Sequence, residues 1–137
     1  MPTAGYSGTP LAQKLGLRDH AVLAVIGAPA EYADWVAPLP AGARIVRRLP
    51  ATPRAVHLFC TARDDLTRRL TALRTSLAHD GYVWVSWPKK SAKVPTDITE
   101  DVIRSVALPL GFVDVKVCAV SDEWSGLKLM IRKSERT

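Results

Sequence analysis

A stretch near the middle of the chain constrains the fold most. Residues 81–88 read Gly-Tyr-Val-Trp-Val-Ser-Trp-Pro, an apolar run rich in β-branched and aromatic side chains. Such a run is typical of a strand that is buried on both faces, as in α/β proteins. The loop that follows carries Lys89, Lys90 and Lys93 beside a serine. Because α/β proteins commonly bind ligands where a buried strand ends, this basic loop is a candidate site.

The pattern along the rest of the chain predicts alternating strands and helices. Apolar runs predict strands at 21–26, 43–49, 55–60, 112–120 and 124–133, and helical spacing or helix-start signals predict helices near 10–16, 30–37, 61–79 and 97–109. Only about three residues separate the last two strands, so these two must be antiparallel. We therefore expect one α/β domain over 1–137. It has a single open, mostly parallel Rossmann-like sheet of about six strands, with helices on both faces and a C-terminal antiparallel hairpin. Residues 1–7 and 134–137 are expected to be loose tails.

Local signals add detail to three of these elements. The arginines in 43–49 suit a strand at the edge of the sheet, where charge discourages pairing with other chains. Thr61 is placed to cap the helix that follows it. Asp97-Ile-Thr-Glu100 has the pattern of a capping box, with Asp97 as the N-cap.

Composition narrows the classes of function. The net charge of +6 is spread along 137 residues, and no motif of a nucleic-acid-binding fold accompanies it, so the charge is interpreted as an aid to solubility rather than as a nucleic-acid site. No basic segment followed by an apolar segment opens the chain, and no apolar run approaches the length of a membrane span. The expected location is the cytoplasm, without membrane attachment.

The residue types that carry catalysis do not form a recognisable set. Cys60 and Cys118 lie in apolar runs and are interpreted as buried reduced thiols, and the three histidines lack zinc-like spacing with them. His57 precedes Cys60 by three residues, so it should lie on the opposite face of its strand. Neither a Gly-x-Ser-x-Gly elbow nor a glycine-rich phosphate loop occurs. We therefore predict no catalytic residue and no metal site.

A Rossmann-like sheet that ends in an antiparallel hairpin resembles the S-adenosylmethionine-dependent methyltransferases. The segment SLAHDGYVWVSW, residues 76–87, is similar to the helix, glycine turn and fifth strand of those enzymes. The resemblance implies a shortened version of their fold, without one helix and one strand in the first half.

The cofactor-binding positions implied by that resemblance do not match. The turn after the first strand has the single glycine Gly27, followed by Ala28-Pro29, where the enzymes have several glycines. The acidic residue that they place after the second strand is replaced by Arg47-Arg48. The acidic position around their fourth strand falls in the stretch from Arg54 to His57. No cofactor is predicted, and a degenerate or unusual methyltransferase-like enzyme is the alternative function.

Three segments resemble a narrower family. GTPLAQKLG at 8–16, SWPKKSAKVPTDIT at 86–99 and DVKVCAVSDEWSGLKLMIRK at 114–133 are similar to the domain of unknown function 3052 family, which consists of small, mostly bacterial proteins. This resemblance implies a shared fold and does not imply an activity.

The candidate site lies at the carboxyl ends of the parallel strands, where open α/β sheets bind their ligands. The hairpin should turn at the same edge. The candidate ligand-binding residues are Gly27, Thr61, Ser86, Trp87, Lys89, Lys90, Ser91, Trp124 and Ser125. The leading hypothesis is a non-enzymatic binding or regulatory domain that holds a partner protein or a small anionic ligand there. A structural interpretation stays open, in which Lys89 and Lys90 pair with Asp122 and Glu123, and the two tryptophans are covers for the core.

Overall fold

A computed structural model describes residues 9–136 of the chain. The elements in chain order are α1 (Leu11–Lys14), β1 (Val22–Ile26), α2 (Tyr32–Val36), β2 (Arg44–Val46), β3 (Ala55–Phe59), α3 (Arg63–Ser76), β4 (Tyr82–Pro88), the 3₁₀ turn η1 (Lys90–Ala92), α4 (Glu100–Leu110), β5 (Phe112–Ala119), β6 (Trp124–Ile131) and the 3₁₀ turn η2 (Lys133–Glu135).

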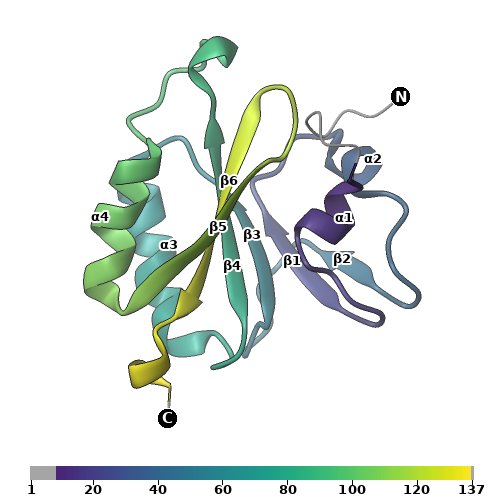
Figure 1. Cartoon of the computed structure of the whole chain (residues 1–137), viewed down its shortest axis with the longest axis horizontal. Coiled ribbons are helices and arrows are strands. Elements are labelled where there is room, and N and C mark those ends of the chain that lie inside the picture. Colours follow the sequence, from purple (N-terminus) through teal and green to yellow (C-terminus); the bar gives the residue numbers. More distant parts are fainter. Residues whose placement is uncertain (1–8, 137) are drawn as a thin grey trace.

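The strands form one six-stranded sheet with the order β2-β1-β3-β4-β6-β5 (Figure 1). The strands β1 to β4 are parallel to one another, and β6 is antiparallel to both β4 and β5. The α/β class and the antiparallel C-terminal pair predicted from the sequence are confirmed. The sheet as a whole is mixed.

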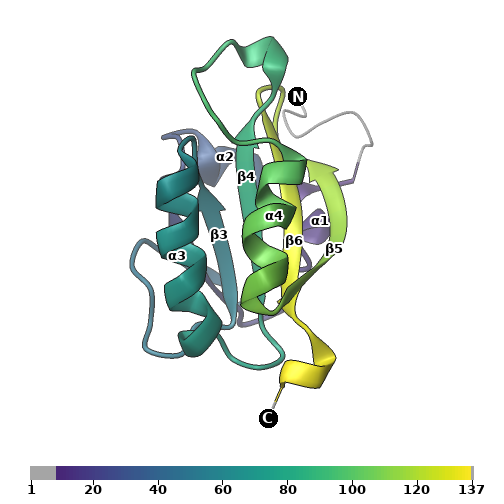
Figure 2. The same ribbon diagram turned by 90° about the vertical axis from the view of Figure 1, so that its left-hand side faces the viewer.

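Helices cover both faces of this sheet (Figures 1 and 2). The helices α3 and α4 pack on one face, whereas α1 and α2 pack on the other. The central strand β3 explains the arrangement, because its side chains alternate between the two cores. Val56, Leu58 and Cys60 belong to the α3/α4 core, while Ala55 and Phe59 belong to the α1/α2 core. A strand between two cores must be apolar throughout, as the run 55–60 predicts.

Leucines at helical spacing pack α3 against the sheet. Leu66, Leu70 and Leu73 are completely buried in the α3/α4 core. Burial of each such side chain stabilises the fold by about 1.5–3 kcal/mol. On the other face, the indole Nε1 of Trp84 donates a hydrogen bond of 3.0 Å to the carbonyl of Leu15 and so attaches the end of α1 to the sheet.

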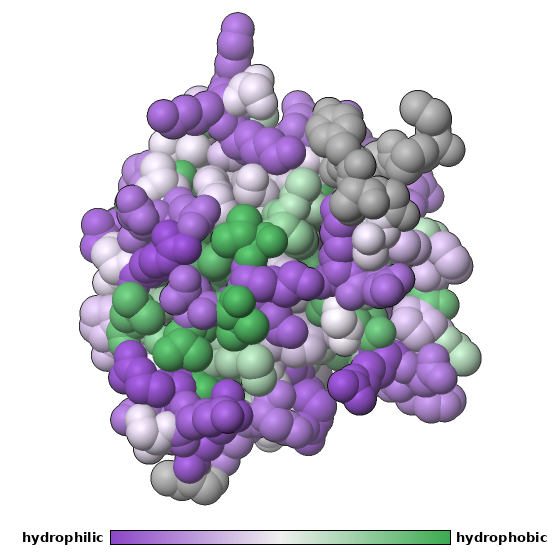
Figure 3. Space-filling view, in the orientation of Figure 1, coloured by the Kyte–Doolittle hydropathy of each residue, from purple (hydrophilic) through white to green (hydrophobic). Residues whose placement is uncertain are grey.

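Two strands form the edges of the sheet. The edge position of β2 is confirmed, although it has three residues because it pairs only with Val22–Ala24 of β1. At the other edge, Val115 and Val117 of β5 are about half exposed, and apolar side chains gather over β5 and the neighbouring end of α4 in Figure 3. A bulge between Asp114 and Lys116 interrupts the ladder of β5, which makes this edge a poorer template for another strand.

The helix caps differ from the prediction. The N-cap of α3 is Ala62, and the Asp97 carboxylate accepts the backbone N–H of Arg63 at 2.7 Å. The N-cap of α4 is Thr99, whose hydroxyl accepts the N–H of Val102 at 3.2 Å. The predictions for Thr61 and Asp97 were therefore wrong. The reason is tertiary, because the segment before α4 folds over the start of α3 and presents Asp97 to that helix instead of its own.

The end of the chain is held to the body of the protein. The guanidinium Nε of Arg136 donates to the carbonyl of Ile131 at 2.8 Å, and Glu135 forms an ion pair of 3.3 Å with Arg74 of α3. A loose tail was expected from residue 134; Glu135 and Arg136 make these two contacts. The predicted tail at 1–7 lies outside the described residues.

Candidate functional site

The carboxyl edge of the sheet brings together the two segments predicted to meet there. Trp124, the first residue of β6, pairs in register with Pro88, the last residue of β4. Beyond the pair, the N–H of Lys89 donates to the carbonyl of Glu123 at 2.9 Å. The turn between β5 and β6 therefore lies beside the lysine loop, which comprises residues 89–96, at the top of Figure 1.

The two tryptophans of the predicted site lie on opposite faces of the sheet. Trp87 is buried in the α3/α4 core, and Trp124 packs in the α1/α2 core with its ring 5.0 Å from that of Phe59. Ser125 pairs in register with Trp87 and is only partly exposed. Although they are neighbours along the edge, Trp87 and Trp124 therefore do not form a common surface.

The lysine loop projects beyond the sheet (Figures 1 and 2). Lys90, Ser91 and Lys93 are exposed, and Lys89 is partly so. None of the ion pairs within residues 9–136 joins Lys89 or Lys90 to Asp122 or Glu123. The structural pairing that the sequence left open is thus not formed, and the ammonium groups face solvent.

The base of this loop is tied to the start of α3. The Thr96 hydroxyl donates to the carbonyl of Thr61 at 2.6 Å, and the backbone N–H of Asp97 donates to the same carbonyl at 3.3 Å. With the Asp97 cap on Arg63, these bonds fix the carboxyl end of the exposed segment, and the bond from Lys89 to Glu123 fixes its start. Thr61 takes part through its backbone, and its side chain is exposed beside the loop.

Ser86 belongs to a buried polar network instead of the surface. His57 lies between two hydroxyls, with Nε2 2.7 Å from Oγ of Ser86 and Nδ1 2.8 Å from the hydroxyl of Tyr32. All three residues are completely buried. Burial lowers the pKa of His57 to about 3 and raises the pKa of Tyr32, so both are neutral. A neutral imidazole donates at one nitrogen and accepts at the other, which satisfies the whole network.

Aromatic rings complete the closure of this part of the edge. His57 stacks on Phe59 with ring centres 4.4 Å apart, and Tyr32 meets both rings edge-on at 5.3 and 5.5 Å. Trp124 covers the other side of Phe59. These contacts join α2, β3 and β6 above the carboxyl half of the sheet. They leave Tyr32, His57 and Phe59 almost inaccessible to a ligand.

Gly27 is exposed at the end of β1, and its backbone explains the residue type. Its φ is +77°, and a Cβ atom there would lie 2.9 Å from the carbonyl oxygen of Phe59. A glycine is thus required for the chain to turn this close to β3, without any ligand.

The Cys60 thiol at this edge is not an activated nucleophile. Burial, together with Asp65, raises the pKa of the Cys60 thiol to about 12, so it is not a thiolate at neutral pH. Cys60 and His57 face opposite cores, as predicted. Within residues 9–136, no three His, Cys, Asp or Glu side chains form a group able to hold a metal ion. In the same residues, no helix has the length and apolarity that a membrane crossing requires.

The residues at this edge do not fit S-adenosylmethionine in the way that the methyltransferase resemblance implies. β2 ends at Val46, and the next residues, Arg47 and Arg48, supply exposed guanidinium groups where a carboxylate is expected. The Tyr32 ring is buried against Phe59 immediately after the turn at Gly27. The chain therefore offers neither the acidic contact nor the open glycine-rich turn.

The buried network is the feature that sequence reasoning missed. From the sequence, His57 was weighed as a zinc ligand and as a base for Cys60, and neither role was expected. The available signal was a histidine inside the otherwise apolar run 55–60, since a buried imidazole needs polar partners on neighbouring elements. Those partners, Tyr32 and Ser86, are separated from it by 25 and 29 residues. The pairing of β3 with β4 brings Ser86 close, and the packing of α2 on the sheet brings Tyr32 close.

Comparisons of the fold place the chain near methyltransferases. A SAM-dependent methyltransferase from Aquifex aeolicus superposes with a TM-score of 0.61 at 12% identity, over 88% of this chain and 87% of that one. A putative type 11 methyltransferase from Sulfolobus solfataricus gives a TM-score of 0.53 at 14% identity, over 84% and 85%. The fibrillarin pre-rRNA processing protein of Methanococcus jannaschii gives 0.56 at 11%, over 94% and 71%. At these identities the likeness establishes a methyltransferase-like fold.

Comparisons of the sequence are narrower. No curated protein matches the chain. Of the three segments that resemble the family, 86–99 and 114–133 lie within the range that a family model matches, and 8–16 lies outside it. That model, described as "Protein of unknown function (DUF3052)", matches residues 54–133, which is more than half of the chain, so the chain belongs to this family.

Proposed function

We propose that this protein is a non-enzymatic binding domain built on a methyltransferase-like scaffold. Its carboxyl edge binds a partner or small ligand that carries carboxylate or phosphate groups. The observation that supports this most is the lysine loop, residues 89–96, which holds three cations within five residues. Among residues 9–136, no carboxylate forms an ion pair with Lys89 or Lys90. We infer that Gly27, Thr61, Trp124 and Ser125, which lie at strand ends on this edge, supply the remaining contacts.

The anchoring of the loop favours binding. Because Asp97 and Thr96 fix the segment to α3, little conformational entropy is lost when an anion binds between the lysines. Each exposed ion pair contributes only about 0–1 kcal/mol, so several must act together. The binding should therefore weaken strongly with added salt.

Among residues 9–136, the lack of an acid–base or nucleophilic set at this edge supports a binding role over catalysis. His57 is buried and neutral, and the pKa of the Cys60 thiol is raised. The alternative, a degenerate methyltransferase-like enzyme, is supported by the fold alone. Titration with S-adenosylmethionine separates the two, because only the enzyme requires the cofactor.

A charge-matched pair of variants tests the proposal. The loop variant carries Lys89→Ala, Lys90→Ala and Lys93→Ala. The control carries Arg48→Ala, Lys116→Ala and Lys133→Ala, which removes the same three charges from exposed positions elsewhere. The probes are poly-L-glutamate and inorganic phosphate, measured by isothermal titration at low and physiological salt. We expect the loop variant to bind poly-L-glutamate about tenfold more weakly, and the control to change by less than about threefold. Equal losses in both variants would mean that net charge alone is responsible, and the proposal would be wrong.

A further inference from the structure

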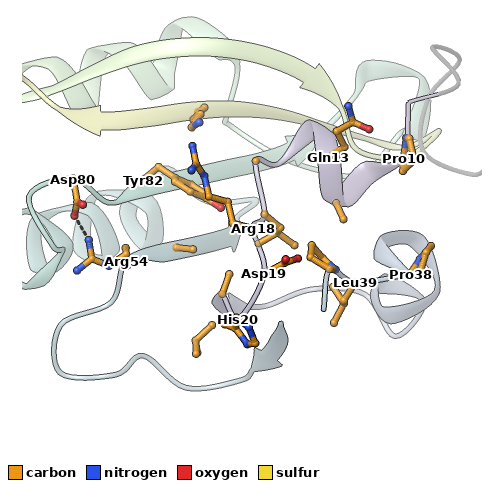
Figure 4. Close-up of a pocket in the computed structure, with 18 of the residues that line it drawn as sticks. Pro10, Gln13, Arg18, Asp19, His20, Pro38, Leu39, Arg54, Asp80 and Tyr82 are labelled. Atoms are coloured by element: carbon orange, nitrogen blue, oxygen red, sulfur yellow. Dashed lines mark hydrogen bonds and ion pairs between the residues drawn. The ribbon is translucent and has the colours of Figure 1, made fainter. Parts of the chain in front are cut away.

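A cavity lies at the amino edge of the sheet, opposite to the lysine loop (Figure 4). Its volume is about 1170 Å³, large enough for a small organic molecule. The loop after α1, the loop after α2, the starts of β3 and β4 and the end of β6 surround it. Its lining includes Leu17, Arg18, Asp19, Leu39, Arg54, Asp80, Tyr82 and Lys128.

Lys128 is the most informative residue of this cavity. It is half-buried on β6, and its ammonium nitrogen lies 4.7 Å from the centre of the Tyr82 ring. Burial and the nearby Lys116 lower the pKa of Lys128. Among residues 9–136, no carboxylate forms an ion pair with it. A partly desolvated cation that faces a cavity without an opposite charge favours an anion from outside.

Arg18 adds a second cation at the same ring. Figure 4 shows its guanidinium beside Tyr82. Burial raises the pKa of Tyr82 to about 12, with Arg18 opposing that rise, so the phenol is neutral and able to donate a hydrogen bond. The side chains of Lys128 and Arg18 thus both lie next to the neutral ring of Tyr82.

The acidic side chains of the cavity are engaged or placed elsewhere. Asp80 forms an ion pair with Arg54, drawn as a dashed line in Figure 4. The Asp19 carboxylate lies on the Leu39 side in this view, whereas Arg18 reaches towards Tyr82. The region around Tyr82 therefore has an excess of positive charge.

The lining also contains the polar residues Gln13 and His20 and several apolar ones, among which Leu17 and Leu39 are both half-buried. We propose that this cavity binds a small organic anion, whose carboxylate or phosphate lies near Lys128 and Arg18 and whose apolar body lies against Leu17 and Leu39. This site is separate from the lysine loop. Tyr82 begins β4 and the loop follows its end, and a strand of seven residues spans roughly 20 Å.

Four small probes distinguish the features of the proposed ligand. Phenyl phosphate and benzoate carry both a charge and an apolar ring, inorganic phosphate has the charge only, and benzyl alcohol has the ring only. Each is titrated into the ¹⁵N-labelled full chain at physiological salt. We expect phenyl phosphate or benzoate to shift the amide signals of Gly16, Arg18 and Tyr82. The better of these two should bind at least about fivefold more tightly than inorganic phosphate or benzyl alcohol. Comparison of the two ring-bearing anions identifies the preferred charged group.

Three lysine variants test the assignment. Lys128→Met keeps the apolar stem and should weaken binding of the better probe about tenfold, because one charge-assisted contact is lost. Lys128→Arg should keep the affinity within about threefold, and Lys133→Met, at an exposed position, should not change it. Thermal unfolding checks that each variant is folded. An unchanged affinity in Lys128→Met, signals that shift only at residues 89–97, or no binding of either ring-bearing anion would each overturn the proposal.

Discussion

The two ends of the sheet differ in how they are filled. At the carboxyl end, Tyr32, His57 and Ser86 form a buried polar network beneath Phe59 and Trp124, and little of it is accessible. At the amino end, a cavity of about 1170 Å³ is open and contains Lys128 without a carboxylate partner from residues 9–136. Sheets of this kind commonly bind ligands at the carboxyl end. The comparison teaches that the fold offers a location, and that the side chains decide whether it is used.

The carboxyl end should therefore be the more important for stability. Phe59→Ala removes a ring that contacts three other aromatic groups, and we expect it to lower the free energy of unfolding by about 3–5 kcal/mol. Leu39→Ala, on the wall of the amino-end cavity, should cost only about 1 kcal/mol. Denaturant unfolding measures both. Similar losses for the two variants would contradict the contrast between a closed and an open end.

Acid should destabilise the carboxyl end through His57. Its pKa is lowered in the folded protein from the ordinary 6.5 to about 3, so the unfolded chain takes up a proton that the folded one excludes. The stability that neutral His57 contributes to the fold is fully present above pH 6.5 and is lost as the pH falls towards 3. Between pH 7 and pH 5 the free energy of unfolding should fall by about 2 kcal/mol. Most carboxylates titrate below this window, which isolates the histidine. Constant stability from pH 7 to 5, or ring signals of His57 that titrate there in the folded protein, would exclude this role.

The anchor of the lysine loop should have a moderate effect. Asp97→Ala removes the cap on Arg63 of α3, and we expect a loss of about 1 kcal/mol. Asp97→Asn keeps an oxygen acceptor and should lose less than half as much. Thermal unfolding of both variants provides the measurement. If Asp97→Asn is as unstable as Asp97→Ala, the hydrogen bond is not the cause.

The lysines of the loop should have the smallest effect on stability. Lys89→Ala with Lys90→Ala should change the free energy of unfolding by less than about 0.5 kcal/mol, because neither side chain forms an ion pair within residues 9–136. The same variant should bind poly-L-glutamate more weakly. An unfolded double variant would show instead that the loop is structural.

Much of the fold could be predicted because local patterns determine it. The run 55–60 and the leucines of α3 have the periodicity of a central strand and an amphipathic helix, and the short turn after β5 requires an antiparallel pair. The caps could not be predicted, since Asp97 contacts a helix that begins 34 residues earlier in the chain.

The candidate site was predictable only in part. The sequence places Lys89 and Trp124 at one edge, and the register of β4 with β6 confirms that proximity. It does not show that Trp87 and Trp124 face opposite sides, because that follows from the pleat and the pairing together. Lys128 and Arg18 come from distant segments that no motif connects, and the cavity between them was therefore not foreseen.

Titration of S-adenosylmethionine into the full chain tests the central claim most directly, namely that the closed carboxyl end has no place for the cofactor of the methyltransferase-like fold. We expect no heat of binding up to about 1 mM cofactor at physiological salt, and no change in the amide signals of Gly27, Tyr32 and Arg47. Binding with a Kd in the micromolar range, with shifts at those three residues, would contradict the claim and favour the enzyme.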